Sequence, residues 1–85
     1  MSDLDTRFKE AADQAQELPE RPDNDTLLKL YALYKQGSDG DISGEKPGFF
    51  DFVGVAKYEA WEKIKGMPQE EAKQKYIELI HSLKG

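Results

Sequence analysis

Apolar residues recur every three or four positions along most of this chain, and such spacing collects them on one face of an α-helix. The first stripe covers positions 4–18. Ser2 or Asp3 can cap the helix that it predicts. Pro19 and Pro22 end this helix, because proline and the residue before it disfavour helical backbone.

The second helix follows three adjacent residues that each suit an N-cap, Asp23, Asn24 and Asp25. Its apolar face contains Leu27, Leu30, Tyr31 and Tyr34. Gly37 ends it, since glycine is favoured just past a helix C-terminus.

Two more helices are predicted in the second half of the chain. The third follows Asp51, closes at Gly66 and carries on one side Phe52, Ala56, Ala60, Trp61 and Ile64. The fourth opens at Pro68 and has as its stripe Ala72, Tyr76, Ile77, Ile80 and Leu83. No segment alternates like a strand, so we expect an all-α protein with a single domain over residues 1–85.

Positions 37–47 lack any periodicity and predict a long loop. Four of its residues match the first, third, fifth and sixth positions of a calcium-binding EF-hand loop: Asp39, Asp41, Ser43 and Gly44. The twelfth position is Phe50, where that motif needs a glutamate, and Pro47 lies within the loop. The acids are therefore better explained as turn formers.

Composition narrows the range of functions. Twelve basic and seventeen acidic residues give a net charge of −5, which argues against nucleic-acid binding. The acidic excess lies in residues 1–25, so a local basic site remains open downstream. The absence of cysteine excludes disulfides, and the single histidine, His81, argues against structural zinc and leaves no pair for catalysis. With no apolar run that could span a membrane and no secretion signal, we expect a cytoplasmic protein.

Tyrosines and lysines recur at helical spacing on the second and third helices. Tyr31, Tyr34 and Lys35 could stack on a base and meet a phosphate. Tyrosines at this spacing are more often core residues whose hydroxyl reaches water. Lys57 precedes Trp61 by one turn, where a lysine stem commonly just covers an indole.

Short motifs at fixed spacing occupy residues 31–61: Tyr-Ala-Leu-Tyr-Lys-Gln at 31–36, Gly-Asp at 40–41, Pro-Gly at 47–48, Asp51, Gly54, Ala-Lys-Tyr at 56–58 and Ala-Trp at 60–61. Phe-Lys-Glu-Ala-Ala at 8–12, Lys-Gly at 65–66 and Tyr-Ile at 76–77 extend the match over nearly the whole chain. With these motifs the sequence resembles the acyl-CoA-binding protein family. The resemblance implies a four-helix bundle in up-down-down-up order, with the long loop between helices two and three.

The resemblance also implies a ligand and its contacts. Family members bind and transport medium- to long-chain acyl-CoA esters without catalysis. Carried over to this chain, Tyr31, Lys35 and Lys57 would meet the ribose 3′-phosphate and its neighbours, and Tyr34 would lie against the adenine. Ala32, Leu33 and Tyr76 would complete the site. The residues implied for the acyl pocket are Phe8, Ala11, Ala12 and Leu28.

Two positions depart from the family pattern. Gln16 and Val53 stand where many members place a lysine that reaches the ligand, so the head-group site carries less positive charge. The resemblance implies a monomer that needs no cofactor and meets acyl-CoA-using enzymes transiently. Two alternatives come from the residues alone: a helical module that grips a partner helix, and a calcium-binding loop protein.

Overall fold

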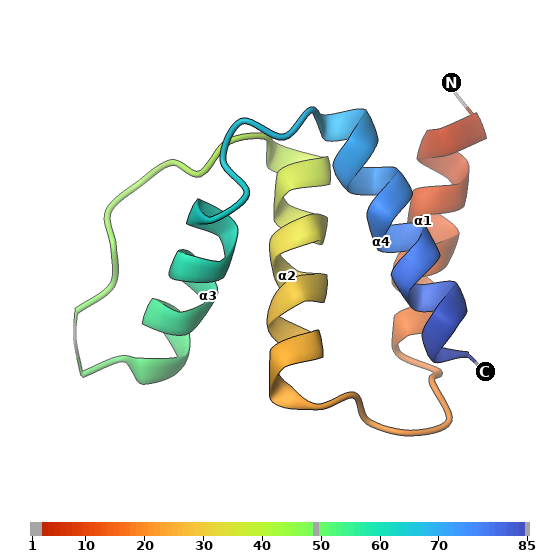
Figure 1. Ribbon diagram of the computed structural model, residues 1–85, viewed down its shortest axis with the longest axis horizontal. Coiled ribbons are helices and arrows are strands. Elements are labelled where there is room, and N and C mark those ends of the chain that lie inside the picture. Colours follow the sequence, from red (N-terminus) through yellow and green to blue (C-terminus); the bar gives the residue numbers. More distant parts are fainter. Residues whose placement is uncertain (1–2, 49, 85) are drawn as a thin grey trace.

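Four helices make up the fold. The structure is a computed structural model that describes residues 3–48 and 50–84. Its helices are α1 (Asp3–Ala15), α2 (Asn24–Asp39), α3 (Phe52–Glu62) and α4 (Gln69–Leu83), as Figure 1 shows. No strand occurs within the described ranges, which confirms the all-α prediction. Ser2, one of the two residues expected to cap the first helix, lies outside the described residues.

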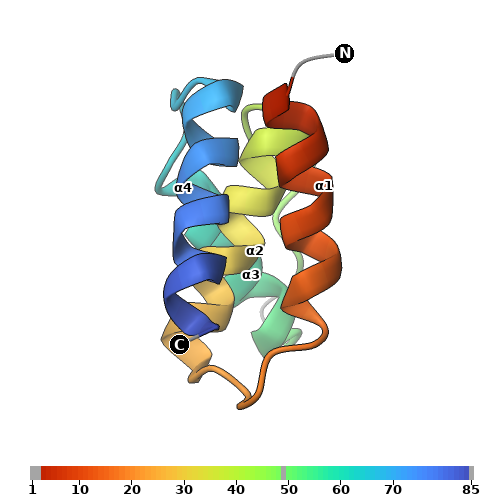
Figure 2. The same ribbon diagram turned by 90° about the vertical axis from the view of Figure 1, so that its right-hand side faces the viewer.

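The helices follow the up-down-down-up order. In Figure 1, α1 and α4 run in one direction and α2 and α3 run in the other. Because α2 and α3 are parallel, the long connection between them must return from one end of the pair to the other. α2 packs against both α3 and α4, and α1 packs against α4. The molecule is flat, with extents of 36 × 30 × 15 Å, and Figure 2 shows α1 and α4 side by side in front of α2 and α3.

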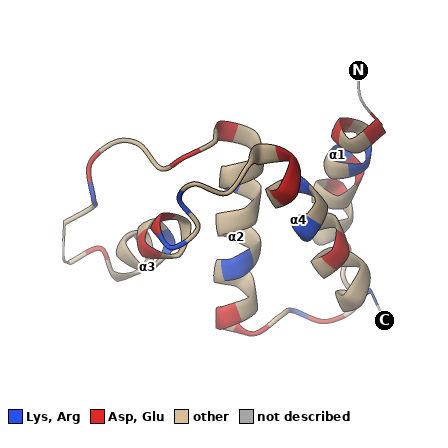
Figure 3. Ribbon diagram, turned by 45° about the horizontal axis from the view of Figure 1, so that its top comes forward, with Lys and Arg blue, Asp and Glu red and all other residues tan. Residues whose placement is uncertain are grey.

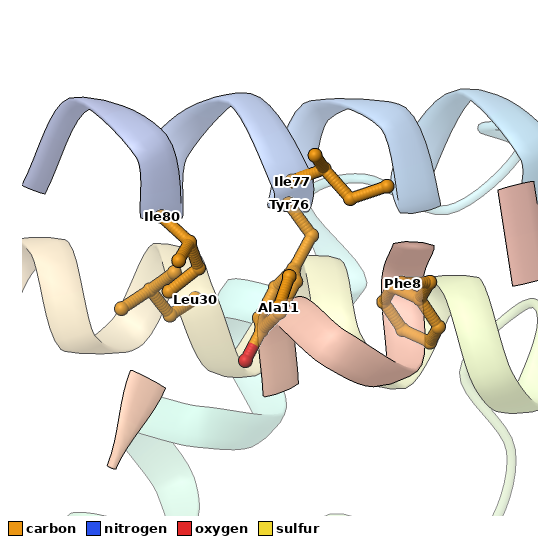
Figure 4. Packing of buried hydrophobic residues seen from close by; sticks show 6 residues of the cluster. All are labelled: Phe8, Ala11, Leu30, Tyr76, Ile77 and Ile80. Carbon is orange, nitrogen blue, oxygen red and sulfur yellow. The ribbon is translucent and has the colours of Figure 1, made fainter. Parts of the chain in front are cut away.

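The hydrophobic core lies where α1, α2 and α4 meet. Its buried residues are Phe8, Ala11, Leu30, Tyr76, Ile77 and Ile80, all drawn in Figure 4. These residues belong to the stripes that the sequence predicts for their helices. Leu27 and Leu83 from the same stripes are partly buried against this cluster. Burial of such a continuous apolar face supplies the main favourable term in the folding of a small helical protein.

The predicted N-caps of α2 and α3 are present. Of the three candidates before α2, the structure selects Asp23, whose Oδ1 accepts a hydrogen bond from the Thr26 N–H at 2.8 Å. This bond lowers the pKa of the Asp23 carboxyl. Asp51 caps α3 in the same way, accepting from the Gly54 N–H at 3.0 Å.

Two helix ends differ from the sequence prediction. α1 stops at Ala15, and Gln16 and Glu17 continue it only as a turn. The ring of Pro19 explains this end, because a proline is incompatible with a helical carbonyl four residues earlier. α2 does not stop at Gly37 but runs to Asp39. Gly37 lies buried inside the helix, where a Cβ atom would come within 3.0 Å of Lys73 Cγ and 3.2 Å of Phe8 Cζ.

Two details of α3 also differ. Phe52 was expected on the apolar side of the helix, but its side chain is 77% exposed. It is the first residue of α3, at the far end from the indole of Trp61, which is buried. α3 ends at Glu62, and the chain then forms turns up to Gly66.

A buried polar cluster joins α2, α3 and the two connections. The Gln36 side chain is fully buried, and its Nε2 donates to Asp41 Oδ1 and to the Met67 carbonyl, both at 2.8 Å. Its Oε1 accepts from Trp61 Nε1 at 3.0 Å. Asp41 Oδ1 also accepts from the Gly66 N–H at 2.7 Å, and these bonds lower the pKa of the Asp41 carboxyl. The cluster thereby fixes the C-terminal end of α3 relative to the C-terminal end of α2.

Candidate functional site

A groove of about 530 Å³ borders the core at Leu30 and Tyr76 and is lined by residues from all four helices. We name it the tyrosine groove. Its lining residues are Ala12, Ala15, Gln16, Leu18, Pro22, Leu27, Leu30, Tyr31, Tyr34, Lys57 and Tyr76. Alanine and leucine supply an apolar floor, three phenols supply polar tips, and one lysine supplies charge. A cavity of this size and composition is typical of a small-molecule site.

Aromatic packing holds the phenols of the groove in place. The Phe8 ring packs against two of them, stacked on Tyr34 at 5.5 Å between centroids and edge-on to Tyr76 at 5.3 Å. Tyr34 and Tyr76 are 5.9 Å apart. Figure 4 shows the Tyr76 side chain extending from α4 towards α1 and α2. Such contacts restrict the rings to one arrangement before any ligand arrives.

The Tyr76 phenol is protonated at neutral pH, as an ordinary tyrosine is. Burial raises its pKa, and the neighbouring Tyr34 adds to that effect. A neutral phenol keeps its proton and can donate a hydrogen bond to an oxygen of a ligand. Tyr34, in contrast, is 42% exposed, so its ring is accessible to a second planar group.

Lys57 brings the positive charge to the groove from α3. Its Nζ lies 5.2 Å from the centroid of the Tyr31 ring, a cation–π contact between α3 and α2. Among residues 3–48 and 50–84, no carboxylate forms an ion pair with Lys57. Its charge is therefore available to an anionic group at the groove.

Lys35 behaves differently from Lys57. Its Nζ is 2.5 Å from Asp39 Oδ2 and lies 5.1 Å from the centroid of the Trp61 ring. The hydrogen bond with Asp39 raises the pKa of Lys35. Lys35 is not among the residues that line the tyrosine groove. The periodicity had suggested Lys57 as the lysine over Trp61, but the structure places Lys35 there.

A second groove, of about 870 Å³, lies between α2 and α3 and reaches α4. Three residues that the resemblance assigns to the ligand line it: Leu28, Ala32 and Leu33. Ile64, Met67 and three lysines border it as well, Lys29, Lys63 and Lys75. Glu59 also lies there and is paired with Lys46 at 3.2 Å. The expected site residues are thus divided between two grooves.

The remaining expected residues fall into three groups. Ala12 and Gln16 line the tyrosine groove, together with Tyr31, Tyr34, Lys57 and Tyr76. Phe8 and Ala11 lie in the core. Val53 is 66% exposed and is not among the residues of either groove.

Sequence reasoning missed five lining residues: Ala15, Leu18, Pro22, Leu27 and Leu30. Leu27 and Leu30 share a helical stripe with Tyr31 and Tyr34, so the stripe itself could have indicated them. Ala15 and Leu18 belong to the first helical stripe, which could likewise have indicated them, whereas Pro22 lies in the connection after α1, where no periodicity places it.

Two acids of the predicted loop, Asp39 at the end of α2 and Asp41 in the connection after it, make contacts within the fold. Asp39 pairs with Lys35, and Asp41 accepts hydrogen bonds from Gln36 and Gly66. Within the described part of the chain, no cluster of three or more histidine, cysteine or acidic residues could hold a metal ion. Both signs of charge occur on every helix, as Figure 3 shows. No helix of the described ranges is long and apolar enough to cross a membrane.

Comparison with known proteins places this fold in a family. Residues 5–80 match the family described as "Acyl CoA binding protein". The chain is 50% identical over 76 residues to an acyl-CoA-binding protein of Saccharomyces cerevisiae, covering 89% of this chain and 87% of the relative. It is 45% identical to part of the enoyl-CoA delta isomerase 2 of Rattus norvegicus, but the match covers 19% of that protein.

Comparison with solved structures agrees with the sequence comparisons. The crystal structure of acyl-CoA-binding protein 2 from Oryza sativa superimposes with a TM-score of 0.90 at 36% identity, covering 94% of this chain and 87% of that one. The sequence and structure matches therefore extend over nearly the whole chain. The chain belongs to the acyl-CoA-binding protein family.

Proposed function

We propose that this protein binds medium- to long-chain acyl-CoA esters reversibly in the tyrosine groove and carries or buffers them without catalysis. The family and its acyl-CoA-binding relatives support this ligand. The single observation that carries the proposal is the convergence of Tyr31, Tyr34, Tyr76 and Lys57 over an apolar floor. One surface thus offers places for a polar head and for an apolar tail.

The acyl tail fits the apolar part of the groove. Ala12, Ala15, Leu27 and Leu30 line that part from α1 and α2. Each methylene removed from water contributes about 0.8 kcal/mol, so affinity should rise with chain length until the floor is covered.

The CoA head fits the polar edge. The ammonium of Lys57 can pair with a phosphate as a point charge, while the exposed ring of Tyr34 can stack on an adenine. The neutral phenol of Tyr76 can donate to an oxygen of the ligand. We infer that the protein works as a cytoplasmic monomer with acyl-CoA as its ligand and no cofactor, in transient contact with enzymes that use acyl-CoA.

Isothermal titration calorimetry with a series of acyl-CoA esters tests this function. We expect free CoA to bind weakly and affinity to increase from acetyl- to dodecanoyl-CoA. Equal affinity for acetyl-CoA and palmitoyl-CoA would contradict the proposal, because a groove that binds the tail must distinguish them.

A matched pair of variants tells the two grooves apart. Lys57→Ala removes a charge from the tyrosine groove. Lys63→Ala removes one from the second groove, at the residue that directly follows α3. Loss of a charge-assisted bond should weaken binding by about 1.5–3 kcal/mol in the first variant and leave the second near wild type. The reverse order would place the ligand in the second groove.

A further inference from the structure

The ion pair between Lys35 and Asp39 stands next to the proposed site. The two residues are one helical turn apart on α2, and the Nζ and Oδ2 atoms are 2.5 Å apart. Their side chains are 31% and 50% exposed. Because the pair is partly exposed, an anion from solution can compete with the carboxylate for the ammonium group.

The backbone of Lys35 is close to the tyrosine groove, although its ammonium group lies over Trp61 and beside Asp39. It directly follows Tyr34 and lies one turn after Tyr31, and both phenols line the groove. The lysine stem is flexible, so a change of rotamer can move its ammonium from above Trp61 towards the phenols.

Asp39 is an unexpected residue for its place in the helix. It is the last residue of α2, where the helix dipole disfavours a negative charge. The C-cap does not need its carboxylate, because the Gly40 N–H satisfies the Gln36 carbonyl at 3.1 Å. The Asp39 carboxylate instead forms an ion pair with the ammonium of Lys35.

We propose that Asp39 is an internal competitor of the ligand: it holds Lys35 against Trp61, away from the tyrosine groove, and a phosphate of the ligand must displace it. This inference rests on the proposed acyl-CoA binding. Asp39 acts through Lys35 and is a positioning residue.

The affinity for dodecanoyl-CoA, measured by calorimetry at low ionic strength, tests whether Asp39 competes with the ligand for Lys35. Asp39→Asn should bind about two- to five-fold more tightly than wild type, the range that an exposed ion pair can contribute. Asp39→Glu retains the charge and should keep the wild-type affinity. In a Lys35→Ala background, Asp39→Asn should have little effect, because the lysine that it releases is gone.

Asp25→Asn is the matched control. It removes the same charge from the same helix, fourteen residues and hence about 21 Å along the axis from Asp39, so it leaves the Lys35–Asp39 ion pair in place. Equal binding by wild type and Asp39→Asn overturns the inference alone. A gain that persists without Lys35, or that Asp25→Asn reproduces, also overturns it. A wild-type protein that binds no acyl-CoA overturns both the proposed function and this inference.

Discussion

At the scale of single residues, the buried side chain of Gln36 joins three separate parts of the structure. It contacts Asp41, Met67 and Trp61 through three hydrogen bonds, so one side chain links the long connection, the turn before α4 and α3. A fully buried amide is tolerated only when its bonds are made. Gln36 therefore specifies where α3 sits, and with α3 the position of Lys57.

Gln36→Leu should test this role because it keeps the side-chain volume while removing all three bonds. The Met67 carbonyl and the amide's other partners lose a buried hydrogen bond, so the free energy of unfolding should fall by about 1–3 kcal/mol. Urea denaturation followed by circular dichroism measures the change. Gln74→Leu, which removes an exposed bond to Glu78, is the control and should stay within about 0.5 kcal/mol of wild type.

At the scale of elements, two glycines near the end of α2 have different roles. Gly37 is helical and leaves room for two side chains that reach α2 from neighbouring helices, Phe8 of α1 and Lys73 of α4. Gly40 stops the helix, with φ 85° and ψ −151°, a conformation that costs other residues energy. Its carbonyl also accepts from Trp61 Nε1 at 3.0 Å. The end of α2 is therefore fixed by Gly40 rather than by Gly37.

Gly40→Ala should lower the free energy of unfolding by about 1–3 kcal/mol, because alanine cannot adopt this backbone conformation without strain. Chemical denaturation measures it. Gly48→Ala is a suitable control in the same connection, since Gly48 has no positive φ and nothing lies within 4 Å of the added Cβ. If the two variants are equally stable, the backbone at Gly40 is not a strained position for alanine.

At the scale of the whole molecule, the tyrosine groove depends on all four helices. α1 contributes Ala12, α2 contributes two tyrosines, α3 contributes Lys57 and α4 contributes Tyr76. α1 is attached through α4, where Lys73 forms an ion pair with Asp5 at 2.5 Å. A ligand in the groove contacts every helix at once, so it should stabilise the fold as a unit.

Long-chain acyl-CoA at one hundred times its dissociation constant should therefore stabilise the protein by about 2.7 kcal/mol. For a chain of this length that corresponds to a rise in Tm of roughly 10–20 °C. Differential scanning calorimetry measures it, with free CoA at the same concentration as the control. An unchanged Tm under saturating ligand would contradict binding to the folded state.

The amino-acid sequence alone determined the helices and most of the core. Helical periodicity is a local property, so the stripes containing Leu30 and Ile80 and the caps at Asp23 and Asp51 could be found without knowing what they touch. The resemblance supplied the helix order and a set of contact residues. The structure brings Tyr31, Tyr34, Lys57 and Tyr76 of that set together, and their binding role stays a prediction.

The tertiary structure decided whatever depends on partners distant in sequence. Gly37 lies inside the helix where Phe8 and Lys73 leave little room for a Cβ atom, and Gln36 can be buried because Asp41, Met67 and Trp61 satisfy its hydrogen bonds. Lys35 and Lys57 look equivalent in the sequence, yet only Lys57 lines the groove. Periodicity assigns a residue to a face, whereas its contacts depend on how separate helices pack, which no local pattern contains.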